Sequence, residues 1–265
     1  MAEPESDPAG DQLGGRPGRF GTILEQLAEH GTIRVVDLAR RLRVSPMTVR
    51  RDLEELERRH LLTRTHGGAV TRSVVYELPL RSRSTAHIEE KRRIAAAAAG
   101  LVAEGAVIGL TGGTTTTEVA RALIERESLT VVTNALNIAW ELAVHRHIKL
   151  VLTGGVVRTS SYELGGPLAE ETLSRLNLDL VFLGVDGLDV RHGLTTHQEV
   201  EAHTNRTMIA HANRVVVAAD HSKIGQVRFA QICPLRAAHG LITDRAADPA
   251  QVSALRSAGL PVELV

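Results

Sequence analysis

A glycine- and threonine-rich string, TGGTTT at residues 111–116, follows the apolar run AVIGL at residues 106–110. Such a run is typical of a buried strand, and the residues after the string have a helical pattern. Backbone N–H groups at the start of a helix attract anions, and threonine hydroxyls add hydrogen-bonding groups. The string therefore predicts a site for a phosphate or another anion, while a plain strand-to-helix turn with threonine caps remains the alternative.

Further polar residues follow other apolar runs that have the length of buried strands. Asn134 follows LTVVT, Asp186 follows VFLGV and Lys223 follows VVVAAD. In an open parallel sheet, ligands bind outside the carboxyl ends of the strands. We therefore expect one ligand site, which includes these residues from the strand ends: Asn134, Gly154, Gly155, Arg158, Asp186 and Lys223.

The stretch SPMTVRRDL, residues 45–53, has the pattern of a helix start. Ser45 fits an N-cap, and Pro46 fits the first helical position, where its missing N–H costs nothing. Val49, Leu53 and Leu56 recur at helical spacing and define a core side. The period then turns four side chains wholly or partly outward, namely Met47, Thr48, Arg50 and Arg51.

Two adjacent outward arginines suit the recognition of a nucleic acid. An arginine can bridge two acceptors of guanine in the major groove or hold a backbone phosphate. Arg50 and Arg51 are thus candidates to read bases or to hold the DNA backbone. The alternative for either one is a surface ion pair with Glu54 or Glu55.

Charge is segregated along the chain, although the formal net charge is zero. Residues 16–72 contain twelve arginines, no lysine and seven acidic residues, an excess of five positive charges. The first 15 residues carry four acids and no base. A local basic excess is typical of a module that binds a polyanion, although a solvated helix surface would produce it too.

Composition argues against a disordered protein and against a membrane protein. Apolar residues make up 43% and charged residues 23%, which is ordinary for a globular protein. No apolar run approaches the ~20 residues that span a bilayer, and the start lacks the layout of a secretory signal. We expect a soluble, cytoplasmic protein without membrane contact.

Metal and cysteine chemistry are not expected. The single cysteine, Cys233, cannot form an intrachain disulfide or a cysteine-based zinc cluster, and we interpret it as a structural thiol. The string HQEVEAH holds His197, Glu201 and His203, but it has no apparent third ligand and no HExxH pattern. No metal or other cofactor is predicted.

The N-terminal elements needed to position the arginines can be predicted from periodicity. A first helix begins near Phe20, a second covers residues 35–42, and a third runs from Pro46 to about Arg59. The following LLTRTHGGAV alternates before Gly67 and Gly68, which indicates a small two-stranded ribbon. Three helices and a wing therefore form a winged helix-turn-helix over residues 16–72, after a disordered acidic tail at residues 1–15.

An alanine-rich helix is expected over residues 84–103, with residues 89–93, including Lys91, on its outer side. Residues 73–90 are a linker and the start of this junction helix. From residue 91 to 265, strand-like and helix-like runs alternate, which favours an α/β domain with a mostly parallel sheet and helices on both faces.

Residues 22–70 resemble the winged helix-turn-helix of the DeoR family of bacterial transcription regulators. The hallmark S-x-x-T-[IV]-R-R-D-L matches Ser45 to Leu53, and R-x-H-G-G-A matches Arg64 to Ala69. In a helix-turn-helix, the second helix of the motif enters the major groove. The resemblance implies contacts with a double-stranded DNA operator from Ser45, Met47, Thr48, Arg50, Arg51, Arg64 and His66.

The second domain resembles the sensor domain of the same family, which is related to ribose-5-phosphate isomerase and binds a phosphorylated sugar. The shared strings are G-T-T-T, T-N-[AS], G-G-x-x-R, D-G, G-x-T-T and D-x-S-K, in this order. Two departures are Thr111, where many members have Asp, and His221 within DHSK. The implied effector-binding residues are Gly112, Gly113, Thr114, Thr115, Thr116, Asn134, Gly154, Gly155, Arg158, Asp186, Thr196, Glu199 and Lys223.

The resemblance implies a repressor of carbohydrate catabolism genes, which acts as a homodimer or homotetramer and responds to a phosphorylated sugar. The members most similar in these motifs carry T-T-x-x-E-x-E-A, as at Thr195 to Ala202, and often govern amino-sugar or hexose catabolism. The rival hypothesis is an active sugar-phosphate isomerase or deaminase with a DNA-binding appendage. In that case Asp186 or Glu199 would act as a general base next to the sugar carbonyl.

Overall fold

In a computed structural model of the chain, the structure describes residues 16–30, 32–58, 61–70 and 80–265. Residues 1–15, which the sequence predicts to be a disordered tail, and residues 73–79 of the predicted linker lie outside these ranges. Contacts divide the chain into two compact units, Met1–Ala86 and His87–Val265. The first of these is called the N-terminal unit below, and the second the C-terminal unit.

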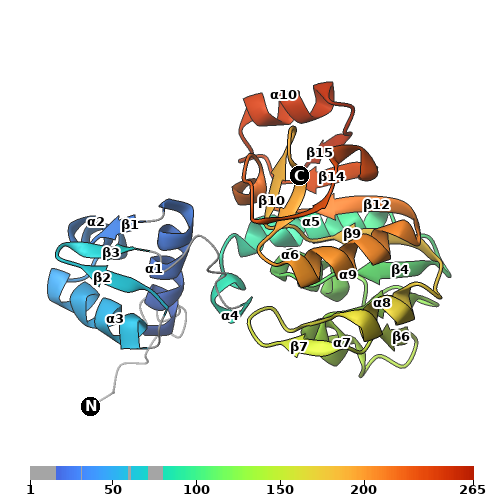
Figure 1. The fold of residues 1–265 in the computed structure, drawn as a ribbon, viewed down its shortest axis with the longest axis horizontal. Coiled ribbons are helices and arrows are strands. Elements are labelled where there is room, and N and C mark those ends of the chain that lie inside the picture. Colours follow the sequence, from blue (N-terminus) through green and yellow to red (C-terminus); the bar gives the residue numbers. More distant parts are fainter. Residues whose placement is uncertain (1–15, 31, 59–60, 71–79) are drawn as a thin grey trace, which may run out of the picture. The chain divides into compact units, whose positions relative to one another are not determined.

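The N-terminal unit packs three helices against a small antiparallel sheet (Figure 1). Its buried core includes Leu24 of the first helix, Leu38 of the second, Leu53 of the third and Leu62 before the sheet. The elements are α1 (Arg16–His30), β1 (Thr32–Arg34), α2 (Val35–Leu42), α3 (Pro46–Arg58), β2 (Thr63–Thr65), β3 (Gly68–Val70) and the short α4 (Leu80–Arg83). The predicted three helices and wing are confirmed.

The wing is a three-stranded sheet in the order β1-β3-β2, not the two-stranded ribbon that the sequence predicts. The additional strand, β1, is only three residues long and falls between two helices, so it has no readable alternation. Its close approach explains one glycine of the wing. A Cβ atom at Gly68 would lie 1.8 Å from the carbonyl oxygen of Ile33.

The C-terminal unit is built on a seven-stranded parallel sheet in the order β15-β14-β12-β9-β4-β5-β6. This confirms the predicted α/β fold with a parallel sheet. The strands are β4 (Val107–Leu110), β5 (Thr130–Thr133), β6 (Lys149–Leu152), β9 (Leu178–Leu183), β12 (Ala212–Ala218), β14 (Gly240–Thr243) and β15 (Val262–Leu264).

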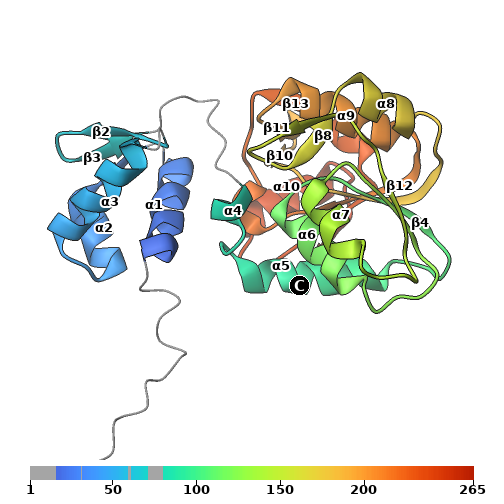
Figure 2. The same cartoon turned by 90° about the horizontal axis from the view of Figure 1, so that it is seen from below.

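Helices cover both faces of this sheet and bury two separate apolar cores (Figure 2). Ile94, Val119 and Ile138 represent the helices of one face, which are α5 (Ile88–Gly100), α6 (Thr114–Ala122) and α7 (Leu136–Leu142). Leu173 and Ala202 represent the other face, which carries α8 (Pro167–Leu173), α9 (Glu199–Ala210) and α10 (Pro249–Ser257).

Two small antiparallel sheets and two short 3-10 helices complete the C-terminal unit. One sheet has the order β10-β11-β13, and the other is a hairpin of β7 and β8. Their bounds are β7 (Val156–Arg158), β8 (Glu163–Gly165), β10 (Gly187–Asp189), β11 (Gly193–Thr196) and β13 (Ala230–Cys233); the 3-10 helices are η1 (His221–Lys223) and η2 (Leu235–Ala237). These strands have three or four residues each, too few to give a clear period.

The predicted junction helix over residues 84–103 is wrong in its start and in the direction of one side chain. The chain forms α4, then a turn that ends with His87 in the left-handed region at φ 51°, and only then α5. Lys91 is 3% exposed and does not lie on the outer side. Its ammonium lies near the buried carboxylate of Asp220, which compensates the cost of burying the charge.

Candidate functional sites

The start of α3 is a capped helix end with exposed side chains. The N–H of Thr48 donates to Ser45 Oγ at 3.1 Å, so Ser45 acts as the cap that the sequence predicts. Ser45, Met47, Arg50 and Arg51 are exposed, and Met47 is 55% exposed. Thr48 is half-buried, and its hydroxyl lies 2.9 Å from that of Ser45.

The two adjacent arginines of α3 have no ion pair within the described ranges. The predicted alternative, a pair with Glu54 or Glu55, is therefore not formed there. Glu55 instead pairs with Arg58 near the end of the helix. Both arginines are exposed on the helix surface and have no charge partner among the described residues.

The wing adds two more exposed candidates for DNA contact. Arg64 in β2 and His66 in the turn before β3 are both exposed. The backbone N–H of Arg64 donates to Glu57 Oε1 at 2.9 Å, and the Arg64 guanidinium lies 3.9 Å from the same carboxylate. This contact ties the wing to the last turns of α3.

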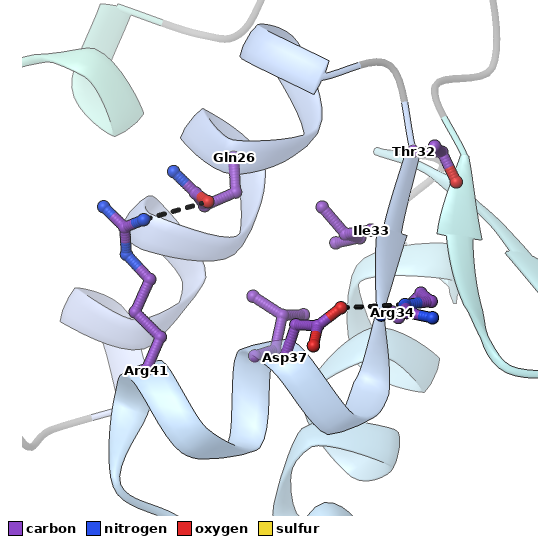
Figure 3. A pocket seen from close by; sticks show the side chains of 7 residues that line it. Gln26, Thr32, Ile33, Arg34, Asp37 and Arg41 are labelled. Carbon is purple, nitrogen blue, oxygen red and sulfur yellow. Dashed lines mark hydrogen bonds and ion pairs between the residues drawn. The ribbon is translucent and has the colours of Figure 1, made fainter.

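A hollow of about 560 Å³ lies in the N-terminal unit between α1, β1 and α2 (Figure 3). Two of its arginines bond side chains that also line the hollow. Arg34 Nε lies 2.8 Å from Asp37 Oδ2, and Arg41 Nη1 donates to Gln26 Oε1 at 3.2 Å. The hollow lies in the N-terminal unit, whereas the predicted effector residues all lie in the C-terminal unit, so we place no effector there.

In the C-terminal unit, the glycine-threonine string forms the predicted turn into α6. Gly113 is the N-cap with φ 131°, a region that favours glycine. The hydroxyls of Thr116 and Thr117 donate to the Gly113 carbonyl at 3.1 and 2.6 Å, so both act as caps. Thr114 and Thr115 make no side-chain hydrogen bond within the described part of the chain.

Thr111, the first departure from the family pattern, connects two strands. Its hydroxyl accepts a hydrogen bond from the N–H of Gly184 at 2.9 Å, which joins the carboxyl ends of β4 and β9. Thr111 is completely buried. Thr111 therefore acts as an internal link between two strand ends.

The sequence missed Glu163 of β8, which lies against the same turn. The N–H of Gly112 donates to Glu163 Oε1 at 3.2 Å, and a Cβ atom at Gly112 would lie 2.3 Å from Glu163 Cγ. Burial, and then the negative charge of Glu201, raise the pKa of Glu163 well above its ordinary value. A neutral Glu163 can donate a hydrogen bond as well as accept one.

Three carboxyl groups meet beside that turn, and one arginine balances them. Thr196 Oγ1 lies 3.0 Å from Asp186 Oδ2 and 2.6 Å from Glu201 Oε1, while Arg158 Nη1 lies 3.0 Å from Glu201 Oε2. Three of the predicted residues, Arg158, Asp186 and Thr196, are thus brought together. Together with Glu163 and Glu201 they are called the carboxylate cluster below.

The structure separates Glu199 from this cluster. Glu199 begins α9 and is exposed, whereas Glu201, two residues later, has a side chain that is only 10% exposed. The sequence did not distinguish Glu201 from Glu199, because both are glutamates in the first turn of α9. Only the exact start of the helix determines which of them faces the sheet.

Asn134 and the glycine pair lie at the ends of β5 and β6. Asn134 is 1% exposed; its Nδ2 donates to the Leu164 carbonyl at 3.3 Å, while its Oδ1 is buried and has no partner among the described residues. A Cβ atom at Gly155 would lie 2.7 Å from the Gly165 carbonyl oxygen. This close approach explains why residue 155 is a glycine. Gly154, in the same loop, has φ 74°.

A second cluster, called the basic cluster below, gathers at the end of β12. Lys223 of η1 and the buried Lys91 of α5 act on Asp220, which is 1% exposed. Burial alone would raise the pKa of Asp220, but the positive charges of Lys223 and Lys91 outweigh it and lower that pKa. Lys91 had been predicted to point outward, so sequence reasoning missed it.

His221, the second departure from the family pattern, has partners of its own. Its Nδ1 lies 2.9 Å from Asp244 Oδ2, and its backbone N–H donates to Asp244 Oδ1 at 2.8 Å. The His221 ring also meets the ring of His87 edge to face, with centroids 4.5 Å apart. The basic cluster comprises His87, Lys91, Asp220, His221, Lys223 and Asp244.

The remaining reactive residues have structural surroundings. Burial raises the pKa of Cys233 to about 11, so it remains a protonated thiol. His203 Nε2 lies 3.3 Å from Glu170, on a different side of α9 from Glu201. Of the described helices, none has both the length and the apolar composition to cross a bilayer.

Two family profiles match the chain. Residues 19–74 match the DeoR-like helix-turn-helix domain, and residues 86–245 match the DeoR C terminal sensor domain. The chain is 40% identical over 241 residues to the HTH-type transcriptional regulator GlpR of Haloferax volcanii, which covers 91% of this chain and 94% of that protein.

Two further relatives are named as repressors. The putative aga operon transcriptional repressor of Escherichia coli O157:H7 is 34% identical over 98% of both chains. The glycerol-3-phosphate regulon repressor of Escherichia coli K12 is 36% identical over 78% of this chain and 82% of that protein.

Solved structures with a similar α/β domain are more distant. Ribose 5-phosphate isomerase A of Methanocaldococcus jannaschii has a TM-score of 0.40 and 21% identity over 52% of this chain and 55% of that one. The probable sor operon regulator of Shigella flexneri has a TM-score of 0.40 and 11% identity over 68% and 92%. By the two family profiles and the full-length relatives, the chain belongs to the DeoR family of DNA-binding transcription regulators and is not an enzyme.

Proposed function

We propose that this regulator represses genes of carbohydrate catabolism and that a phosphorylated sugar, bound in the C-terminal unit, lowers its affinity for the operator. One observation carries the proposal. A carboxylate cluster, a turn with helix N–H groups and a basic cluster all lie at or beside carboxyl ends of strands of the parallel sheet. The names of two relatives, an aga operon repressor and a glycerol-3-phosphate regulon repressor, agree with this class of effector.

The two clusters divide the recognition of such a ligand. Carboxylates and the Asn134 amide suit sugar hydroxyls, which both donate and accept hydrogen bonds. The N–H groups at the start of α6 and the ammonium groups of Lys91 and Lys223 suit the phosphate. We propose the sequence-derived effector residues as the site, with Glu163, Glu201 and Lys91 added and Glu199 at its margin.

On the DNA side, we propose that Arg50 and Arg51 contact the operator, one nearer to base edges and the other nearer to phosphate. The exposed, uncompensated state of both arginines supports this assignment. Ser45, Met47 and Thr48 lie at the same end of α3, and Arg64 and His66 would follow the backbone from the wing. We further propose that the regulator works as a dimer or tetramer.

The rival function, an isomerase or deaminase, is not retained. The family and the full-length relatives of this chain are regulators. One of its two candidate bases, Glu199, is exposed and lies outside the carboxylate cluster.

A thermal-shift panel of sugar phosphates tests the proposal. A ligand at 100 times its dissociation constant stabilises the folded state by ~2.7 kcal/mol. Each phosphorylated sugar is paired with the same sugar without phosphate, so that the two clusters are tested separately. We expect stabilisation by one or a few phosphorylated sugars and much less by their neutral partners. If no sugar phosphate in the panel shifts the transition or changes operator binding, the proposal fails.

A further inference from the structure

Helix α7 is apolar on two opposite sides. Ile138, Ala139 and Leu142 face the core of the C-terminal unit and are buried. Leu136, Trp140 and Val144 recur every four residues on the outer side and are 42%, 81% and 76% exposed. Val144 follows the helix in a turn whose preceding residue, Ala143, still has helical dihedrals. These three outer residues are called the α7 stripe.

The α7 stripe exposes a side chain that this protein uses sparingly. The chain has one tryptophan, three phenylalanines and two tyrosines, and the single tryptophan is almost completely exposed. A helix with apolar residues all round is normally buried. Tryptophan is enriched at the centres of protein interfaces, where it contributes more binding energy than most residues. The stripe therefore has the composition of an interface that one copy of the chain leaves uncovered.

The neighbourhood of the stripe extends this surface. Helix α7 packs on β5 and β6, and β6 is the last strand at its end of the parallel sheet (Figure 1). Leu152 of β6 is 38% exposed. Parallel sheets are usually covered on both faces, and an open edge strand invites pairing. Because a stable interface buries about 800 Å² on each partner, three side chains alone do not suffice, and this edge supplies adjoining area.

Charge around the stripe is balanced within the chain. Arg121 of α6 bonds Glu141 of α7 at 2.7 Å and also pairs with Glu118, and Arg92 of α5 lies 3.9 Å from Glu118. Arg92 also pairs with Glu89 at 2.8 Å. The exposed Arg146 follows the stripe, so this border holds three arginines and three glutamates. In a two-fold interface the same patch meets itself, so a net charge would repel its own copy. A balanced border fits a second copy better than it fits a polyanion or a strongly charged partner.

We propose that the α7 stripe is the centre of a two-fold interface between two copies of this chain, with Trp140 as its anchor. DNA recognition supplies an independent reason for a second copy. Each chain has one recognition helix, and helix-turn-helix regulators bind paired half-sites through symmetric dimers. The proposal rests on the DNA-binding role of the chain but not on the identity of its effector.

The test compares three full-length proteins by sedimentation velocity: the wild type, Trp140→Asp and Phe229→Asp. Phe229 is a matched control, because it is also aromatic and 69% exposed but lies in the segment before β13. We expect an even assembly for the wild type and for Phe229→Asp at micromolar concentration. Trp140→Asp should have half that mass or less, with self-association weakened at least ~100-fold by the buried charge. A Trp140→Asp protein with the wild-type mass and a native circular dichroism spectrum would overturn the proposal.

The fluorescence of the single tryptophan gives a second readout that needs no variant. In the assembled wild type, Trp140 should emit at short wavelength and resist quenching by acrylamide. On dilution, its emission should shift to longer wavelength at the concentration at which the mass falls. If the assembly persists while Trp140 emits like an indole in water, the stripe is not the interface. The fluorescence of the wild type tests the proposed interface even if Trp140→Asp fails to fold or if both variants dissociate. An effector-induced thermal shift that survives in Trp140→Asp separates this outcome from a failure of the proposed sensor function.

Discussion

The candidate DNA site on α3 and the candidate effector site of the C-terminal unit differ in how far their polar groups are already satisfied. Arg50 and Arg51 are exposed and have no described ion-pair partner, so a ligand can bind them without breaking an internal bond. Glu163, Asp186 and Asp220 are buried and bonded to other residues of the unit. A ligand that enters there must replace existing bonds. The difference agrees with the proposed roles of the two sites, because a ligand that replaces internal bonds also changes the protein.

The largest effect should come from a charge placed in the glycine-threonine turn before α6. Gly113→Asp puts a carboxylate where the phosphate would bind, and Gly113→Asn has the same size and the same backbone strain at φ 131° without the charge. We expect Gly113→Asp to weaken the effector response by more than ~100-fold, while operator affinity without effector is kept. Operator binding during an effector titration measures both. If Asp and Asn variants lose the response equally, strain and not charge is the cause, and the turn is not the phosphate site.

The surface character of the DNA site predicts a smaller loss. Arg50→Ala and Arg51→Ala should each cost ~1–3 kcal/mol of operator binding. The variant that loses a base contact should relax specificity at one operator position, and the variant that loses a phosphate contact should flatten the salt dependence by about one unit. Arg58→Ala is the control, because Arg58 is on the same helix but pairs with Glu55. Wild-type binding by both single variants would remove the arginines from the DNA site.

Two ion pairs inside the N-terminal unit test whether a buried pair stabilises the protein more than an exposed pair. Arg19 Nε lies 2.8 Å from Asp52 Oδ2, and Asp52 is 2% exposed. Asp52→Asn should lower the free energy of unfolding by ~1–3 kcal/mol, because a neutral amide replaces the charged partner of the partly buried Arg19. Asp37→Asn removes the partner of an exposed pair with Arg34 and should cost under ~1 kcal/mol. Denaturant titration compares the two, and equal losses would contradict the role of burial.

The last prediction concerns the pKa of Glu163. Because this pKa is raised in the folded protein, the folded state binds more protons than the unfolded chain above pH 4.5, and the contribution of Glu163 to stability falls as pH rises. Glu163→Gln cannot ionise and keeps a carbonyl to accept the Gly112 N–H. It should therefore gain stability relative to the wild type as pH rises, by at most ~1.4 kcal/mol per pH unit. Thermal unfolding from pH 5 to 8 measures the difference, and a difference independent of pH would show that Glu163 is charged in the folded state.

The sequence predicted the parts of both regions that depend on local periodicity. The three helices, the strands that lead to the candidate effector site and the outward direction of Arg50 and Arg51 follow from spacing along one element. Lys91 and Glu163 could not be placed in this way. Lys91 lies in a run of charges that looks solvated, and its partner Asp220 is 129 residues away in the chain.

Contacts across the sheet edge were equally unreadable. Glu163 reaches Gly112 from a hairpin whose strands have three residues each, too short for an alternation to stand out. Glu199 and Glu201 are chemically identical, and only the start and rotation of α9 determine which of them faces Thr196. The position of a residue within a motif therefore did not predict where its side chain points.

The close approach of Gly68 to Ile33 has a consequence for anyone who transplants wings between regulators to change operator preference. The motif RTHGGA joins two kinds of position. Arg64 and His66 are exposed, whereas Gly68 and Ala69 are buried, and a methyl group at residue 68 would collide with the backbone of β1. A graft can vary the exposed tip freely only if it retains residues 68 and 69, because these two positions are part of the scaffold and not of the reading surface.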